Sequence, residues 1–158
     1  MSEKSQATTA TQLNKVLNGN NYIPNDTIIR IEDLPRYTSL DQLFGKRYYK
    51  VLFLQGQQQI GHWVLLTHLK DKDLEYFDPA GKLPPQILVD WAGALGVDDI
   101  MYSQVPLQHS KSYNCGRFVL ARISSQPTTL DVFIDVLQSS RSFTPDQMVE
   151  LLFNVDSE

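Results

Sequence analysis

Three consecutive segments rich in β-branched, aromatic and aliphatic residues occupy the middle of the chain, at 47–55, 62–69 and 74–78. A polar turn at 56–61 and a charged turn at 70–73 separate them. Connections this short join antiparallel neighbours, because parallel strands need a crossover of a dozen residues or more. The sequence therefore predicts three consecutive antiparallel strands at the centre of the fold.

Apolar residues three or four apart recur on both sides of this central region, which is helical spacing. Two of these stretches begin with the spacing of a capping box, Ser39 with Gln42 and Thr144 with Gln147. We predict helices at 11–18, 39–44, 87–95, 115–123, 130–137 and 145–153, and short strands at 27–31 and 100–103, with a break at Pro35.

The length of 158 residues fits one domain that can bury a core without disulfides. We assign 1–8 to a disordered leader and 9–158 to a single domain, since no repeat or long linker divides the rest. The leader lacks the apolar stretch of a secretory signal, so we expect the protein not to be secreted. The apolar runs of the whole sequence are too short to cross a membrane.

The charge balance, 14 basic against 18 acidic residues, gives a net charge of −4. Nucleic-acid binding needs clustered Lys and Arg to neutralise phosphates. The composition therefore argues against nucleic acid as the main partner.

The single cysteine, Cys115, excludes an intrachain disulfide and a multi-cysteine metal site. A lone cysteine is most often a small buried hydrophobe, and the alternative is a catalytic thiol. The neighbouring residues decide between these two interpretations.

Catalysis by a thiol needs a base, a group that holds that base, and donors for the oxyanion that forms at the attacked carbonyl. His62 and Asp78 lie on the second and third predicted strands, 16 residues apart. The distant ends of two such strands come side by side, because each residue along one strand is matched by one on the other. We therefore predict that His62 is the base and Asp78 its partner.

Cys115 lies where an irregular polar stretch, 104–114, turns into a predicted helix. The first turn of a helix has unpaired N–H groups and the positive end of the dipole, which favours a reactive thiolate. Gly116 leaves room for a substrate backbone, or is simply a helix-start residue. Gln108, seven residues before the cysteine, could donate its amide to the oxyanion together with the backbone N–H of Cys115.

Other residues compete for these roles. Gln104 lies in the same loop, and His68 and His109 are alternative bases. A metal site built from His62, His68 and Cys115 has no closely spaced ligand pair, so we expect none.

Taken together, four motifs resemble the adenovirus-type maturation protease, a member of the superfamily that also holds the ubiquitin-like-protein deconjugases. They cover about half of the chain in the order expected for that family: Gly61-His62-Trp63, Phe77-Asp78-Pro79-Ala80-Gly81, Gln108 and Asn114-Cys115-Gly116.

This resemblance implies an α+β, papain-like fold with permuted chain order. The helix that carries Cys115 would pack on a small, mainly antiparallel sheet, with further helices around it. The resemblance also implies that Cys115 is the nucleophile, His62 the general base and Asp78 the residue that orients the imidazole. Gln108 and the Cys115 N–H would form the oxyanion hole.

Trp63 and Gly116 would contribute to substrate binding, although a core aromatic is an equal alternative for Trp63. Asp78 is similar to the deconjugases, because the adenovirus enzymes often have Glu there. The seven-residue interval from Gln108 to Cys115 is similar to the viral enzymes, because the deconjugases usually have one residue fewer.

The adenovirus enzyme is basic, uses DNA as a cofactor and tethers an activating peptide through a second cysteine. This chain is acidic and has one cysteine, so neither activation route can simply be carried over, and the need for an activator stays open. Lys111, Arg117 and Arg122 could bind an acidic substrate or form a solvated face. Acetyltransferases of the same superfamily use acetyl-coenzyme A, but no basic cofactor site is evident, and we expect no cofactor.

We therefore expect a monomeric cysteine protease that processes viral structural precursors next to small residues such as Gly. It would act in the host cytoplasm, a viral factory or the virion, in a virophage-like or other double-stranded DNA virus. The alternatives are a protease for a ubiquitin-like modifier and a catalytically silent binding module of the same fold.

Overall fold

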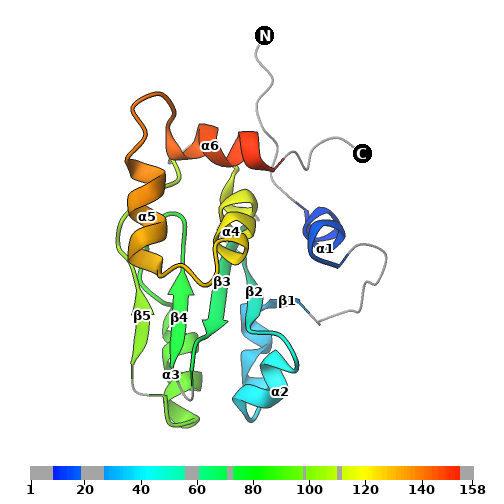
Figure 1. Ribbon diagram of the computed structural model, residues 1–158. Coiled ribbons are helices and arrows are strands. Elements are labelled where there is room, and N and C mark those ends of the chain that lie inside the picture. The colour runs from blue at the N-terminus through cyan, green and yellow to red at the C-terminus, as the bar shows by residue number, and fades with distance from the viewer. Residues whose placement is uncertain are drawn as a thin grey trace.

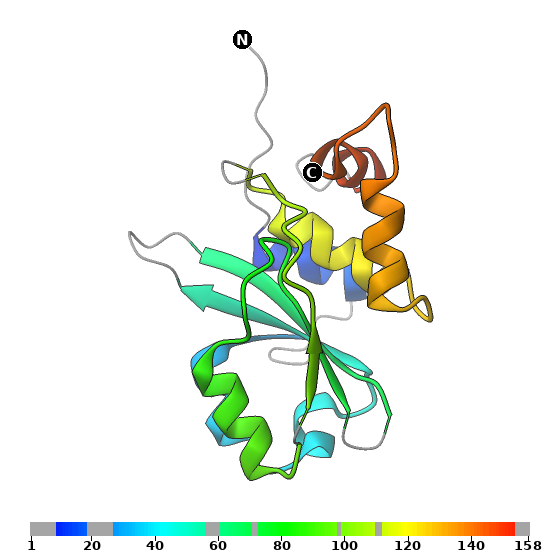
Figure 2. The ribbon, with the colours of Figure 1, turned by 90° about the vertical axis from the view of Figure 1, so that its left-hand side faces the viewer.

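The computed structural model describes residues 9–18, 27–55, 61–70, 73–97, 99–109 and 112–153. These residues form one sheet with helices on both of its faces (Figures 1 and 2). None of the helices in the described ranges is long and apolar enough to cross a membrane.

The sheet contains five strands in the order β1-β2-β3-β4-β5. The central pairs β2–β3 and β3–β4 are antiparallel, as the short connections predict. The outer pairs β1–β2 and β4–β5 are parallel. The strands are β1 (Ile28–Arg30), β2 (Tyr49–Gln55), β3 (Gly61–His68), β4 (Leu74–Phe77) and β5 (Ile100–Tyr102).

The helices begin and end close to their predicted positions. Thr129 and Thr144 cap two of them, and the second cap is a complete capping box. The helices are α1 (Ala10–Asn18), α2 (Leu40–Phe44), α3 (Gln86–Ala94), α4 (Cys115–Ser124), α5 (Leu130–Gln138) and α6 (Pro145–Leu152).

A short 3₁₀ helix, η1 (Ile31–Arg36), includes Pro35, where the sequence predicts a break. The proline ring holds φ near −65°, which lies within the range of a 3₁₀ helix, so the ring costs one backbone donor without ending the turn. The predicted break at Pro35 is therefore wrong: the 3₁₀ helix continues through Pro35 and ends at Arg36.

Alternate residues of β3 contribute to two separate cores. Trp63 and Leu65 pack on the face covered by α1, α4, α5 and α6. Val64 and Leu66 pack on the opposite face, against η1, α2 and α3. Because successive side chains of a strand point to opposite faces, a strand buried on both sides must be apolar throughout, as this one is.

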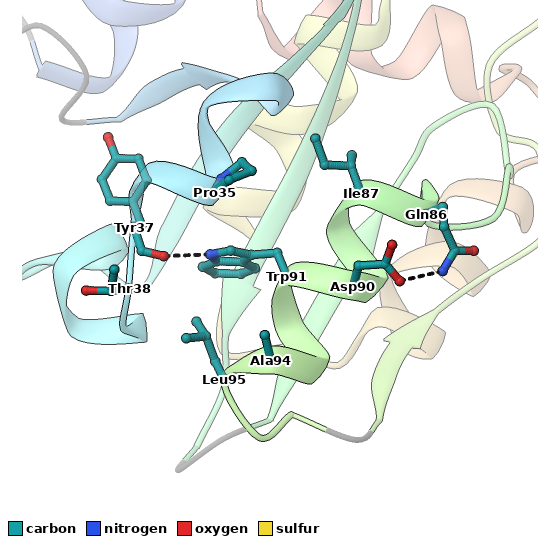
Figure 3. Close-up of a pocket in the computed structure, with 9 residues that line it drawn as sticks. All are labelled: Pro35, Tyr37, Thr38, Gln86, Ile87, Asp90, Trp91, Ala94 and Leu95. Atoms are coloured by element: carbon teal, nitrogen blue, oxygen red, sulfur yellow. Dashed lines mark hydrogen bonds between the residues drawn. The ribbon is translucent and has the colours of Figure 1, made fainter.

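A cavity of about 670 Å³ lies between η1 and α3 (Figure 3). Trp91 Nε1 donates to the Tyr37 carbonyl across it, at 2.8 Å. Trp91 belongs to the core on the α3 side of the sheet, whereas Cys115 belongs to the core on the α4 side. This cavity is therefore separate from the residues discussed next.

Candidate active site

The start of β3 and the end of β4 bring His62 and Asp78 together. The register pairs Leu65 with Phe77, so Val64 is the next residue across from Asp78. His62 lies two residues nearer the start of β3 than Val64, close to the end of β4 where Asp78 follows Phe77. Its Nε2 is 2.6 Å from Asp78 Oδ1. The two residues are therefore adjacent, as the spacing of the strands predicts.

A tight turn after β4 holds the Asp78 carboxylate. The Ala80 N–H donates to Asp78 Oδ1 at 2.8 Å, and the Gly81 N–H donates to the Asp78 carbonyl at 2.8 Å. The Asp78 side chain is only 3% exposed. A carboxylate that is buried and bonded to its own turn has one orientation, so it can fix the ring of His62 in turn.

Cys115 is the first residue of α4, which lies against β3 (Figure 1). Its sulfur accepts a hydrogen bond from the Trp63 backbone N–H, with a distance of 3.4 Å between N and Sγ. The His62 side chain also hydrogen-bonds with Cys115. Since Asp78 occupies Nε2, the other ring nitrogen, Nδ1, is left for the sulfur. The three side chains thus form a continuous chain from carboxylate to imidazole to thiol.

The two roles that the sequence left open for Trp63 are decided by its burial. The residue is 6% exposed and its ring packs against Phe53, with 4.7 Å between the centroids. The indole is therefore a core side chain rather than part of a substrate groove. The contribution of Trp63 to the site comes from its backbone N–H, which no sequence pattern could indicate. Gly116 is buried in the first turn of α4.

The ionisation of His62 reflects two opposing influences. Burial lowers the pKa of the imidazole, but the hydrogen bonds and negative charges of Asp78 and Cys115 outweigh burial and raise this pKa from 6.5 to about 10. At neutral pH the ring is therefore an imidazolium beside the sulfur. The ring therefore places a positive charge next to the sulfur of Cys115.

The raised pKa of His62 predicts a specific pH dependence of stability. A pKa that is higher in the folded state stabilises the protein fully below the unfolded value of 6.5, and this contribution is lost as pH rises through about 10. In urea unfolding across this range, the free-energy difference between wild type and His62→Gln should be largest below pH 6.5 and shrink toward pH 10. A ring that titrates near 6.5 by NMR would contradict this assignment.

The competing bases lie elsewhere. His68 is at the opposite end of β3, where its ring stacks on Phe44 with 5.2 Å between the centroids. His109 is exposed in the loop before α4, and its backbone N–H donates to Asp146. Within the described ranges, no three His, Cys, Asp or Glu side chains lie close enough together to hold a metal ion.

Gln108 is held beside the site by one hydrogen bond of its backbone and one of its side chain. Its backbone N–H donates to the carbonyl of Pro79, the residue after Asp78, at 3.0 Å. Its side-chain Nε2 donates to the Ser112 carbonyl at 2.9 Å, which leaves a second N–H on that nitrogen. Among the described residues, its buried Oε1 has no hydrogen-bond partner. An unpaired buried amide oxygen costs about 1–3 kcal/mol, so stability does not explain this residue.

Gly81 allows the two loops of the site to pack directly against each other. Its φ is +75°, and a Cβ at this position would lie 2.7 Å from the backbone nitrogen of Pro106. Only glycine combines this conformation with such a close approach. The turn that holds Asp78 therefore also supports the loop that leads to Gln108, whereas the alternative donor Gln104 is exposed.

Asn114 precedes α4 but does not cap it. Within the described chain, its side chain accepts no bond from the first turn of the helix. Instead Nδ2 donates to Asp146 at 3.0 Å and to Glu150 at 2.8 Å, and Oδ1 accepts from Arg117 at 3.0 Å. Among the described residues, the Asn114 side chain therefore leaves the second and third N–H groups of α4, next to the thiol, without a cap. No sequence pattern indicates the contact between Asn114 and Asp146, because the two residues are 32 positions apart.

The two arginines suggested for an acidic substrate are structural. Arg117 is 2% exposed and also donates to the Phe153 carbonyl, and Arg122 is 1% exposed and paired with Glu75. Neither a substrate contact nor a solvated face is available to them, which corrects both interpretations. Lys111 lies outside the described residues.

Comparison with known proteins supports the fold. No protein-family model and no curated protein matches this sequence. Among solved structures, the ASFV pS273R protease aligns with 92% of this chain and 66% of its own, with 16% identity and a TM-score of 0.54. A second structure of that protease aligns over 66% of this chain and 42% of its own, with 20% identity and a TM-score of 0.44.

The central domain of the uncharacterized Lpg1148 protein from Legionella pneumophila aligns over 94% of both chains, with 14% identity and a TM-score of 0.50. This chain spans at most 66% of the length of the ASFV protease. At these identities the likeness concerns the fold. The predicted fold class is therefore confirmed: this chain has an α+β fold similar to that of cysteine proteases of the adenovirus-protease and ubiquitin-like-protease kind.

Proposed function

We propose that this chain is a cysteine endopeptidase with Cys115 as nucleophile, His62 as general base and acid, and Asp78 as the residue that orients the imidazole. The observation that carries the proposal is the unbroken chain of contacts from Asp78 through His62 to Cys115 at the start of α4. A silent binding module has no need of a buried carboxylate, an imidazolium and a thiol in this order.

The resting imidazolium beside the sulfur defines the order of steps. The Cys115 thiolate attacks the carbonyl carbon of the scissile peptide bond, and the carbonyl oxygen becomes an oxyanion. His62 then gives its proton to the leaving amine as the C–N bond breaks, which leaves a thioester on Cys115. Neutral His62 then takes a proton from water, whose oxygen attacks the thioester carbonyl; the C–S bond breaks, the acid leaves, and the Cys115 thiolate and the His62 imidazolium are restored.

Two donors are available for the oxyanion. The Cys115 N–H belongs to the uncapped first turn of α4, and the second N–H of Gln108 Nε2 is not used by Ser112. Preorganised donors of this kind contribute about 2.7–4 kcal/mol each to the transition state. We therefore assign the oxyanion hole to these two groups.

The small exposed area of the nucleophile supports a substrate with small residues at the scissile bond. Cys115 is 5% exposed, while the neighbouring His62 side chain is 26% exposed. A carbonyl can reach this sulfur only when little side-chain bulk surrounds it, which favours Gly on its acyl side.

For the biological substrate, we infer a structural precursor of a double-stranded DNA virus, cleaved in the infected cell or the virion by a monomeric enzyme. The likeness to the fold of the ASFV protease and the seven-residue interval from Gln108 to Cys115 support this choice. Asp78 favours the second candidate, a protease for a ubiquitin-like modifier, because the deconjugases have Asp at this position.

The proposed chemistry is tested by labelling with a peptide that ends in Gly-Gly and carries a carboxyl-terminal electrophile. We expect one equivalent of label on Cys115, mapped by mass spectrometry, and no label on His62→Ala. Equal labelling of wild type and His62→Ala would reduce Cys115 to an ordinary thiol and favour the binding module.

A second experiment separates the two substrate classes. The protein is incubated with a panel of virion precursor proteins and with fusions of ubiquitin-like modifiers, and cleavage products are sequenced. Cleavage of precursors next to Gly supports the viral assignment. Cleavage of modifier fusions alone would transfer the proposal to the second candidate.

A further inference from the structure

The loop that carries Gln108 is attached to the first turn of α6 through one carboxylate. Asp146 Oδ2 accepts from the His109 backbone N–H at 2.7 Å, and its Oδ1 accepts from Ser112 Oγ at 2.5 Å and from Asn114 Nδ2 at 3.0 Å. Three residues of the loop thus converge on one side chain that is more than thirty positions away in the sequence.

Each of the three residues that contact Asp146 either adjoins a proposed oxyanion donor in the sequence or is hydrogen-bonded to one. His109 follows Gln108 directly, and the Ser112 carbonyl accepts from Gln108 Nε2 at 2.9 Å. Asn114 directly precedes Cys115, and its own N–H donates to Ser112 Oγ at 3.0 Å. Asp146 therefore binds residues next to both proposed donors, the side-chain amide of Gln108 and the backbone N–H of Cys115.

The contact with Asn114 has a further consequence for α4. Asparagine before a helix normally accepts a bond from the second or third N–H of that helix. Here the Asn114 amide donates to Asp146 and Glu150, and its oxygen accepts from Arg117. These contacts hold the side chain away from the first turn, so the N–H groups beside Cys115 stay available.

We propose that Asp146 is a positioning residue for the oxyanion hole, acting through Ser112 on Gln108 and through Asn114 on the N–H of Cys115. This inference rests on the proposed protease function. A displacement of about 1 Å in such donors can reduce a rate by about 10²-fold, so loss of the carboxylate affects the chemical step rather than substrate binding.

The kinetic test compares Asp146→Ala with Asp131→Ala. Both aspartates occupy the second position of a helix that begins after a threonine cap, so both substitutions remove the same favourable helix-dipole contact. With a Gly-Gly peptide substrate, we expect Asp146→Ala to lower kcat by about 10- to 100-fold with KM nearly unchanged. Asp131→Ala should match wild type. Asp146→Asn retains one acceptor oxygen and should lie between wild type and Ala.

A double-mutant cycle with Gln108→Ala distinguishes positioning from general damage to the fold. Because one of the two routes from Asp146 passes through Gln108, Asp146→Ala should cost several-fold less in the Gln108→Ala background. The full loss in both backgrounds, a rise in KM in place of a fall in kcat, or equal activity of Asp146→Ala and Asp131→Ala would each overturn the proposal.

Amide hydrogen exchange gives a second readout that does not depend on turnover. In Asp146→Ala, the His109 amide should lose protection and the Gln108 side-chain NH₂ resonances should shift, while amides of β2 and β3 keep their wild-type exchange rates. Unchanged His109 and Gln108 signals would refute the positioning role even if the chain cleaved no peptide. Absence of turnover in wild type would instead count against the proposed function.

Discussion

Replacing Cys115 by Ala should lower peptide cleavage by about 10⁴-fold or more, because the substitution removes the atom that forms the covalent intermediate. The fold should persist, since the substitution shortens one small buried side chain at the start of α4. Initial rates with a Gly-Gly peptide measure the loss, and circular dichroism measures the fold.

Cys115→Ser is the matched control for this experiment. It keeps the size of the side chain and the bond from the Trp63 N–H, but its hydroxyl is a far weaker nucleophile than a thiolate. Both variants should therefore be inactive and folded. Activity in Cys115→Ala of more than a few per cent of wild type would remove the residue from its role.

The largest expected loss of stability follows from breaking the buried ion pair between Arg122 and Glu75. Arg122 Nε and Nη2 donate to the two carboxylate oxygens of Glu75 at 2.9 and 2.8 Å, and both side chains are nearly inaccessible. Arg122 also donates to the Thr128 carbonyl at 2.7 Å. Arg122→Met should lower the free energy of unfolding by about 3–5 kcal/mol, because it leaves the Glu75 charge buried and unpaired.

Two further variants test this explanation by denaturant unfolding. Replacing both partners, as in Arg122→Met with Glu75→Leu, should recover much of the loss, because no uncompensated charge remains. Arg30→Met removes the exposed pair with Glu32, which is 3.7 Å apart, and should cost about 0–1 kcal/mol. A similar small cost for Arg122→Met would show that the buried pair is not what joins α4 to β4.

Local patterns predicted the elements that depend on neighbouring residues. The short connections defined the antiparallel order of β2, β3 and β4, and the pattern from Thr144 to Gln147 predicted the cap of α6. The strand order also predicted the proximity of His62 and Asp78. These features could be inferred because turn length, strand period and capping are properties of residues within a few positions of each other.

Long-range contacts decided what the same patterns left open. Arginine usually lies at the surface. Arg117 and Arg122 are buried instead, because each binds a partner far along the sequence, 36 and 47 residues away. Trp63 contributes its backbone to the thiol, and its indole fills the core. The direction of the outer strand pairs likewise depends on crossovers whose path the sequence does not specify.

The amino-acid sequence by itself determined the order of the chemical groups and the antiparallel strands that bring His62 to Asp78. Only the tertiary structure decided that Asp146 supports the loop before Cys115 and that Asn114 leaves the first turn of α4 uncapped. The physical reason is that a hydrogen bond between distant residues depends on the packing of whole elements, whereas strand period and helix caps depend on adjacent residues alone.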